Sequence, residues 1–195
     1  MILAFQSYGV EVSTAITIVF TWIHTLFIPV LGLEIATMSL TGRFIGARDP
    51  NNASDSVFSG LSLASVYALI ISSVCLFAPS EMVGMFLETD SAAEINDLAL
   101  WGTQLYAFMV FIMAWSAILG GALRGAGDTY GTMTISAVFW WLQYAIVVIL
   151  IRLFELSPGI VLGIHIFSSP LLLFAMIGRF RSGAWRKFEL IGKKW

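Results

Sequence analysis

The residue of this chain with the clearest capacity for chemistry is a glutamate inside a long apolar run. Glu34 stands in FIPVLGLEIATMSL, about 13 Å of helix before Arg43 if the run is helical. A carboxylate in hydrocarbon is expensive, so such groups face a bundle interior or a wet cavity and are functional candidates. We expect Glu34 to contact substrate or a coupling ion; a protonated glutamate that is hydrogen-bonded to a neighbouring helix is the alternative.

Three further polar side chains in apolar runs, Ser116, Gln143 and Tyr144, are candidates for contacts with substrate or coupling ion. Interhelical hydrogen bonds from such side chains contribute about 0.6 kcal/mol each on average, so helix packing is the competing explanation. Tyr144 follows Trp140 and Trp141, whose aromatic faces can attract an organic cation. Packing against lipid explains such aromatic residues more often.

The sequence shows no pattern for a metal site or a catalytic nucleophile. Neither His24 nor His165 has a partner at metal-ligand spacing. Cys75 is alone in an apolar run and predicts no disulfide. The acidic segment from Glu81 to Asp97 contains no basic or histidine partner. We therefore predict no catalytic residue, no metal site, no cofactor other than a coupling cation, and no enzyme activity.

The stretch LGGALRGAGDTYGT, 119–132, is a charged, glycine-rich turn between two apolar runs. Glycine permits positive φ, a cation such as Arg124 suits a helix C-terminus, and Asp128 is placed to cap the next helix. The predicted turn motif is Arg124, Gly125, Gly127 and Asp128. Neither nucleotide-binding glycine pattern fits here. The stretch from Gly46 to Pro50 is similar, so one turn is used twice or the likeness is chance.

Composition identifies a membrane protein. Hydrophobic residues make up 58% of the chain and charged residues 11%, and the mean hydropathy is +0.89. Spans must be helical because backbone amides in lipid need internal partners, and the absence of alternating polarity excludes a barrel. We predict an all-α, polytopic bundle with spans at 12–42, 57–78, 98–123, 130–153 and 158–177.

Three parts of the chain are expected from these spans. Residues 1–11 are the end of a preceding helix or an outside tail, 12–178 form the bundle, and 179–195 form a basic tail. The first span would run roughly 46 Å as a straight helix, well beyond the hydrocarbon thickness. Pro29 and Gly32 favour a bent helix there, with a re-entrant hairpin as the alternative.

Basic residues predict the orientation, because they accumulate on the cytoplasmic side. With five spans, nine of the ten lysines and arginines fall on one side and only Arg152 on the other. We expect a multi-pass protein of the plasma (inner) membrane, with the N-terminus outside and the C-terminus in the cytoplasm. The tail mixes bases with Trp185 and Phe188, which predicts an interfacial segment on the lipid bilayer. Nucleic acid is not an expected partner, since the net charge is −2.

Two motifs resemble the multidrug and toxic compound extrusion (MATE) transporters. The first is P-x-L-G-L-x-I-A-T-x-x-L-T-G-R-x-x-G-A-R-D-P, Pro29 to Pro50, and the second is G-x-L-R-G-x-G-D-T, Gly121 to Thr129. The family has twelve helices in two lobes, so the resemblance implies helices eight to twelve of the C-terminal lobe. A truncated reading frame or fragment is then expected, with the N-terminal lobe missing or replaced by a second copy.

The resemblance implies an antiporter that exports drugs or other small organic substrates, including cationic ones, in exchange for H⁺ or Na⁺. The family's pattern has a small residue at Glu34, and no acid stands near Met113, where one subgroup has a cation-binding aspartate. These departures leave the coupling ion undecided. A lipid or polysaccharide flippase-like transporter and a non-transporting membrane subunit are the alternatives.

Overall fold

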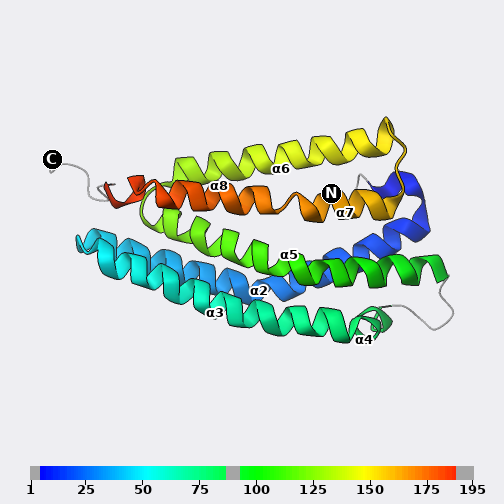
Figure 1. The fold of residues 1–195 in the computed structure, drawn as a ribbon, viewed down its shortest axis with the longest axis horizontal. Helices are drawn as coiled ribbons and strands as arrows, with labels where there is room; N and C mark the ends of the chain where they lie inside the picture. Colours follow the sequence, from blue (N-terminus) through cyan, green and yellow to red (C-terminus); the bar gives the residue numbers. More distant parts are fainter. Residues whose placement is uncertain (1–4, 87–92, 188–195) are drawn as a thin grey trace.

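The computed structural model describes residues 5–86 and 93–187, and it places them in a bundle of long helices (Figure 1). Five helical segments are long and apolar enough to cross a membrane, so the predicted all-helical membrane bundle is confirmed. The elements follow one another as η1 (Gln6–Tyr8), α2 (Val10–Gly46), α3 (Pro50–Phe77), α4 (Pro79–Gly84), α5 (Ala93–Gly125), α6 (Thr129–Arg152), α7 (Pro158–Phe167), α8 (Pro170–Arg181) and η2 (Ala184–Lys187).

Helix α5 is the centre of the bundle. It contacts α2 and α3 on one side and α6, α7 and α8 on the other, as Figure 1 shows. In α5, 67% of the most apolar window is buried inside the protein, against 17% in α6. Hydrophobic surface that the protein does not cover is normal for a helix that faces lipid. The bundle is therefore organised around α5, with α6 at its edge.

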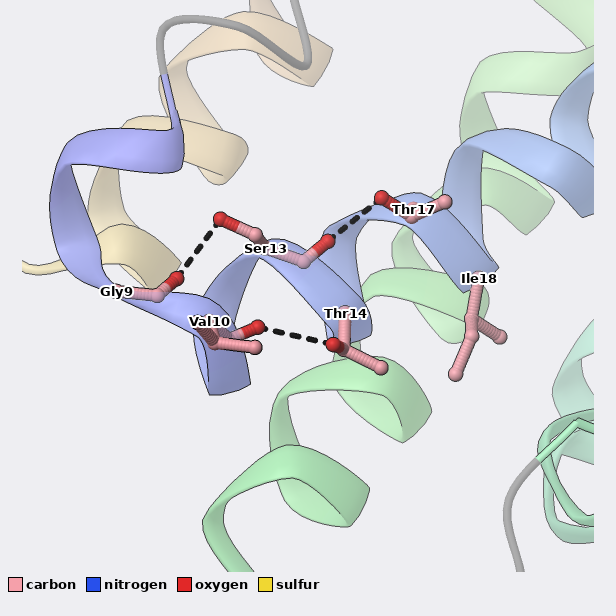
Figure 2. Close-up of a pocket in the computed structure, with 6 residues that line it drawn as sticks. All are labelled: Gly9, Val10, Ser13, Thr14, Thr17 and Ile18. Atoms are coloured by element: carbon pink, nitrogen blue, oxygen red, sulfur yellow. Dashed lines mark hydrogen bonds between the residues drawn. The ribbon is translucent and has the colours of Figure 1, made fainter.

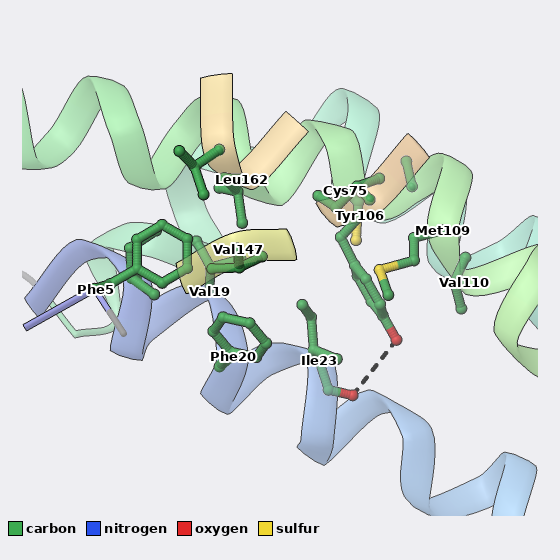
Figure 3. Packing of buried hydrophobic residues seen from close by; sticks show 14 of the residues in the cluster. Phe5, Val19, Phe20, Ile23, Cys75, Tyr106, Met109, Val110, Val147 and Leu162 are labelled. Atoms are coloured by element: carbon green, nitrogen blue, oxygen red, sulfur yellow. Dashed lines mark hydrogen bonds between the residues drawn. The ribbon is translucent and has the colours of Figure 1, made fainter. Parts of the chain in front are cut away.

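Helix α2 is one continuous element of 37 residues that includes Pro29, so the segment forms no re-entrant hairpin. Proline has no N–H, and it leaves the carbonyl four residues earlier without its usual partner. Here that carbonyl belongs to Thr25, and tyrosine hydroxyls from neighbouring helices bond to carbonyls on either side of it: Tyr67 donates to Leu26 (2.7 Å) and Tyr106 to Ile23 (3.4 Å; Figure 3). Helices α3 and α5 thus hold α2 by hydrogen bonds close to its proline.

The fifth predicted span is two helices, α7 and α8, with Ser168 and Ser169 between them. Pro170 causes the break, because it cannot donate to the Ile166 carbonyl. The Ser169 N–H bonds to that carbonyl instead (3.1 Å). The carbonyl of His165, which Ser169 would bond in a continuous helix, is consequently free for other donors. Sequence reasoning read this segment as unbroken, although Pro170 was the signal.

Candidate functional site

The turns that follow α2 and α5 have the same backbone structure. In the first, the N–H of Asp49 donates to the Phe44 carbonyl and that of Arg48 to Ile45; in the second, Asp128 donates to Leu123 and Gly127 to Arg124. The four distances are 2.9, 3.0, 2.9 and 3.0 Å. Arg48 (φ 59°) and Gly127 (φ 96°) occupy the left-handed position of this helix-ending motif. The two stretches therefore resemble each other because both form the same helix-ending turn.

Asp128 does not cap α6 with its side chain, and the prediction that it would is wrong. It occupies the N-cap position without a side-chain cap hydrogen bond. Its carboxylate, 3% exposed, accepts two hydrogen bonds from the Arg179 guanidinium, at 2.6 and 2.9 Å. A paired guanidinium–carboxylate contact is stronger than a single bond from a neutral N–H, so the carboxylate bonds the arginine and not a backbone N–H of α6. The start of α6 is thereby tied to the end of α8.

Glycines bring α2 and α5 into backbone contact. A Cβ on Gly121 would lie 2.8 Å from the Glu34 carbonyl oxygen, and one on Gly42 would lie 3.0 Å from the Gly125 carbonyl oxygen. A Cβ on Gly125 would collide with the Met38 carbonyl. Small residues allow this close approach of membrane helices. We call Gly42, Gly121 and Gly125 the glycine seam.

Glu34 forms an ion pair with Arg124 beside this seam. The glutamate side chain is 15% exposed and the arginine side chain 34%. The partner is the guanidinium of Arg124 on α5, so Glu34 does bond a neighbouring helix, as the alternative supposed, and it does so through an ion pair. Glu34 also lies opposite the last turn of α5, closer to the helix ends than its distance from Arg43 suggested, because α2 extends past the end of α5.

A second polar cluster fills the gap at the α7–α8 break. Gln143 donates from Nε2 to the free carbonyl of His165 (2.7 Å) and contacts its Nδ1 (2.6 Å). The single hydroxyl hydrogen of Ser168 has two acceptors within reach, the Gln143 Oε1 (2.9 Å) and the same carbonyl (2.8 Å). Gln143 and His165 are both buried. The broken helix thus obtains its missing hydrogen bonds from a side chain on α6.

The four predicted contact residues do not form one site. Ser116 is buried on α5 and donates to the Ile112 carbonyl of its own helix. Tyr144 adjoins Gln143 in sequence but points away from the cluster, into a shallow recess that it lines with Trp140 and Trp141. Trp141 is 74% exposed. Glu34 lies with Arg124, and Gln143 with His165.

The first turns of α2 line a hollow of about 520 Å³ that sequence reasoning did not predict (Figure 2). Ser13, Thr14 and Thr17 each donate to the carbonyl four residues earlier, at 2.8, 2.9 and 2.7 Å. The hydroxyls are therefore satisfied within α2 and leave only acceptor positions for a ligand. Their spacing of three and four residues on one helix face was the available signal.

The first part of the tail packs on protein, whereas we predicted a segment on the bilayer surface. Trp185 is 1% exposed, donates to the Phe180 carbonyl (2.8 Å) and stacks on the Phe180 ring. Arg186 lies over the Trp185 ring and donates to Ser54 at the start of α3 (3.1 Å). This anchor links α8 to α3. Phe188, Lys193 and Lys194 lie outside the described residues.

Comparison with known proteins identifies the family of this chain. The family model described as MatE matches residues 1–149. The chain belongs to the MatE family. It is a multi-pass membrane protein, as the family and its apolar helices together show. The prediction from the two glycine-containing motifs is confirmed.

Relatives of this MatE chain are named as multidrug resistance proteins. It is 24% identical over 174 residues to "Probable multidrug resistance protein NorM" of Thermotoga maritima, a match over 86% of this chain and 36% of that protein. It is 29% identical over 117 residues to "Multidrug resistance protein NorM" of Burkholderia vietnamiensis, covering 59% of this chain and 25% of the relative. The chain thus spans about a third or less of the length of these relatives.

Two solved structures share the fold of this MatE chain. "Crystal structure of MATE in the bent conformation" superposes with a TM-score of 0.79 and 18% identity, over 98% of this chain and 44% of that one. "Inward-facing conformation of a multidrug resistance MATE family transporter of the MOP superfamily" gives 0.72 and 22%, over 92% and 44%. Both matches are to less than half of a larger helical protein.

Proposed function

We propose that this chain forms one lobe of a MATE-type antiporter that exports small organic compounds across the plasma membrane in exchange for a cation. The match to the MatE family model carries the proposal, and the names of the relatives support multidrug efflux as the activity. Family membership favours a transporter over an enzyme.

Transport by this lobe requires a second one. Alternating access in two-lobed carriers rocks one bundle against another around a central site, and the described chain is a single bundle around α5. The second lobe is either further polypeptide, as in the longer relatives, or a second copy of this chain. Crosslinking in native membranes, followed by mass determination, distinguishes these arrangements.

The proposed orientation has the N-terminus outside and the C-terminus in the cytoplasm. Both turns lie at the same end of the bundle as the end of α8 (Figure 1), and that end carries Arg48, Arg124, Arg179 and Arg186. Arg152 ends α6 at the opposite end. Maleimide labelling tests this placement: in right-side-out vesicles Phe154→Cys should react with an impermeant reagent and Asn51→Cys should not. Equal labelling of both would contradict it.

Glu34 is the proposed contact for the coupling cation, either H⁺ or Na⁺, and its ion pair makes the role testable. In the complete transporter we expect Glu34→Gln to reduce ethidium efflux at least tenfold while membrane insertion stays intact. Arg124→Gln is the matched variant, because it breaks the same pair and keeps the carboxylate.

The double variant Glu34→Gln/Arg124→Gln separates the two roles of this pair. Loss of one partner leaves a poorly compensated charge, which replacement of both partners removes. If Glu34 binds the cation, the double variant stays as inactive as Glu34→Gln. Recovery of efflux in the double variant would make the pair a helix contact only.

The recess at Tyr144, Trp140 and Trp141 is the proposed contact surface for a cationic substrate. Exposed aromatic faces attract organic cations with about 0.5–1 kcal/mol each. Ethidium should quench the fluorescence of wild-type protein more than that of Trp141→Leu. Equal quenching in both proteins would assign this surface to lipid.

A further inference from the structure

The only two histidines of this chain both contact the ring of one phenylalanine. The ring of Phe20, on α2, is 6.5 Å from the His24 ring and 6.0 Å from the His165 ring, centre to centre. His24 is exposed on α2, and His165 is buried on α7. One aromatic ring is therefore in contact with both an accessible imidazole and an enclosed one.

The contacts of His165 fix the protonation of its ring. The Gln143 amide is oriented by two partners, since its Nε2 donates to the His165 carbonyl (2.7 Å) and its Oε1 accepts from Ser168 (2.9 Å). The same Nε2 lies 2.6 Å from the His165 Nδ1. An amide N–H can only donate, so Nδ1 accepts and carries no proton. The imidazole of this structure is neutral, with its N–H on Nε2.

We propose that His165 is a proton-binding site of this lobe, reached from the His24 side past Phe20, and that protonation releases the α7–α8 break. A proton on Nδ1 would face the Gln143 N–H, so Gln143 has to withdraw. Its withdrawal removes a donor from the free carbonyl of His165 and the acceptor of Ser168. The proton comes from water, and no other bond changes.

The printed contacts of His165 are with uncharged groups: Gln143 on α6, Ser168 after α7 and Phe20 on α2. Among the described residues the salt bridges are Glu34–Arg124 and Asp128–Arg179, and neither includes His165. The neighbouring hydrophobic cluster, which includes Leu162 and Ile166, contains the ionisable groups of Tyr106 and Cys75 and has Tyr8 packed against it. Proton binding at His165 does not depend on transport activity, whereas its use as the coupling site rests on the proposed function.

Nuclear magnetic resonance of the imidazole nitrogens tests the site directly. The chain is labelled with ¹⁵N-histidine, carries no histidine tag, and is held in lipid nanodiscs. His24→Asn leaves a single histidine, so every imidazole signal belongs to His165. As the pH is lowered from about 8 to about 3, we expect the signals to change from one protonated nitrogen to two, together with a shift of the Gln143 side-chain amide.

Gln143→Leu supplies the decisive comparison. It removes the N–H that favours the neutral ring, a hydrogen bond of about 1 kcal/mol, so His165 should bind the proton roughly fivefold more tightly. Ser168→Ala, which loosens the amide without removing it, should give a smaller change and serves if Gln143→Leu does not fold. A ring that stays neutral throughout, or equal proton affinity in all variants, would overturn the proposal.

Efflux measurements separate this proposal from the proposed function. If His165 titrates while the complete transporter shows no efflux with any pH gradient or sodium gradient, the antiport proposal fails and the proton site stands. If efflux depends on a pH gradient equally in wild type and His165→Asn, and His165 does not titrate, the proton site fails and antiport stands.

Discussion

The two turns at one end of the bundle share a backbone but differ in what holds their aspartates. Asp49 is half-buried and accepts from its own neighbour, the N–H (3.1 Å) and Nδ2 (2.5 Å) of Asn52. Asp128 is buried and accepts from Arg179, 51 positions away. The position that corresponds to Asn52 is Gly131, where a Cβ would lie 2.6 Å from the Asp128 Oδ1 and 2.9 Å from the Arg179 Nε. Because Gly131 has no side chain, Arg179 can reach Asp128, and the aspartate makes an interhelical contact in place of a local cap.

The glycines that end the two helices differ in the same way. Gly125 touches the α2 backbone, whereas nothing lies within 4 Å of a Cβ on Gly46. The first turn is thus held by its own sequence, and the second by helices from elsewhere in the chain. Variants at corresponding positions of the two turns can test this difference.

The largest effect is expected from Gly125→Ala, with Gly46→Ala as its control. The new methyl group of Gly125→Ala meets backbone atoms, which cannot rotate away, so we expect a loss of about 3 kcal/mol in the free energy of unfolding. Gly46→Ala should stay within about 1 kcal/mol of wild type. Unfolding in detergent, followed by tryptophan fluorescence, measures both. Equal stability of the two variants would show that the glycine seam is not close-packed.

Gly131→Asn should give the second turn the local asparagine–aspartate contact of the first. The asparagine occupies the space of the Arg179 guanidinium, so the Asp128–Arg179 pair breaks and the melting temperature falls by several degrees. Asn52→Gly, the reverse change, removes a local cap from an exposed turn and should lower it less. A larger effect from Asn52→Gly would contradict the assignment of the stronger contact to Asp128.

Substitution of the residue at the left-handed position should change the free energy of unfolding by a smaller amount. The sign of the change should be opposite in the two turns. Gly127→Ala places a Cβ at positive φ and should cost about 1 kcal/mol. Arg48→Gly relieves the same strain, but the gain is smaller because glycine also raises the entropy of the unfolded chain. Chemical denaturation of the two variants against wild type checks both signs.

The smallest expected effect is a pH dependence of the melting temperature, and it arises from the first turn only. Hydrogen bonds from Asn52 hold the pKa of Asp49 below its ordinary value. The resulting stabilisation is complete above the unfolded pKa and is lost as the pH falls through the folded pKa. The difference in melting temperature between wild type and Asp49→Ala should therefore be constant above about pH 5 and shrink below about pH 4. Asn52→Ala should weaken this pH dependence.

Predictions from sequence held where the controlling interactions are local. The number of membrane helices follows from runs of apolar residues, and the likeness of the two turns follows from glycine and aspartate at fixed positions. The side-chain cap of Asp128 was wrong because Arg179 competes for the same carboxylate. The α7–α8 break was missed because high hydropathy on both sides of Pro170 hid it.

The sequence by itself determined the medium, the helices and the shape of the turns, since these depend on transfer to hydrocarbon and on hydrogen bonds between residues at most five positions apart. Only the tertiary structure decided which polar groups meet. Glu34 and Arg124 are 90 positions apart, and Gln143 and His165 are 22 apart on different helices. Such pairs depend on how the helices pack around α5, because a group that lipid cannot solvate bonds whichever partner the packing brings close.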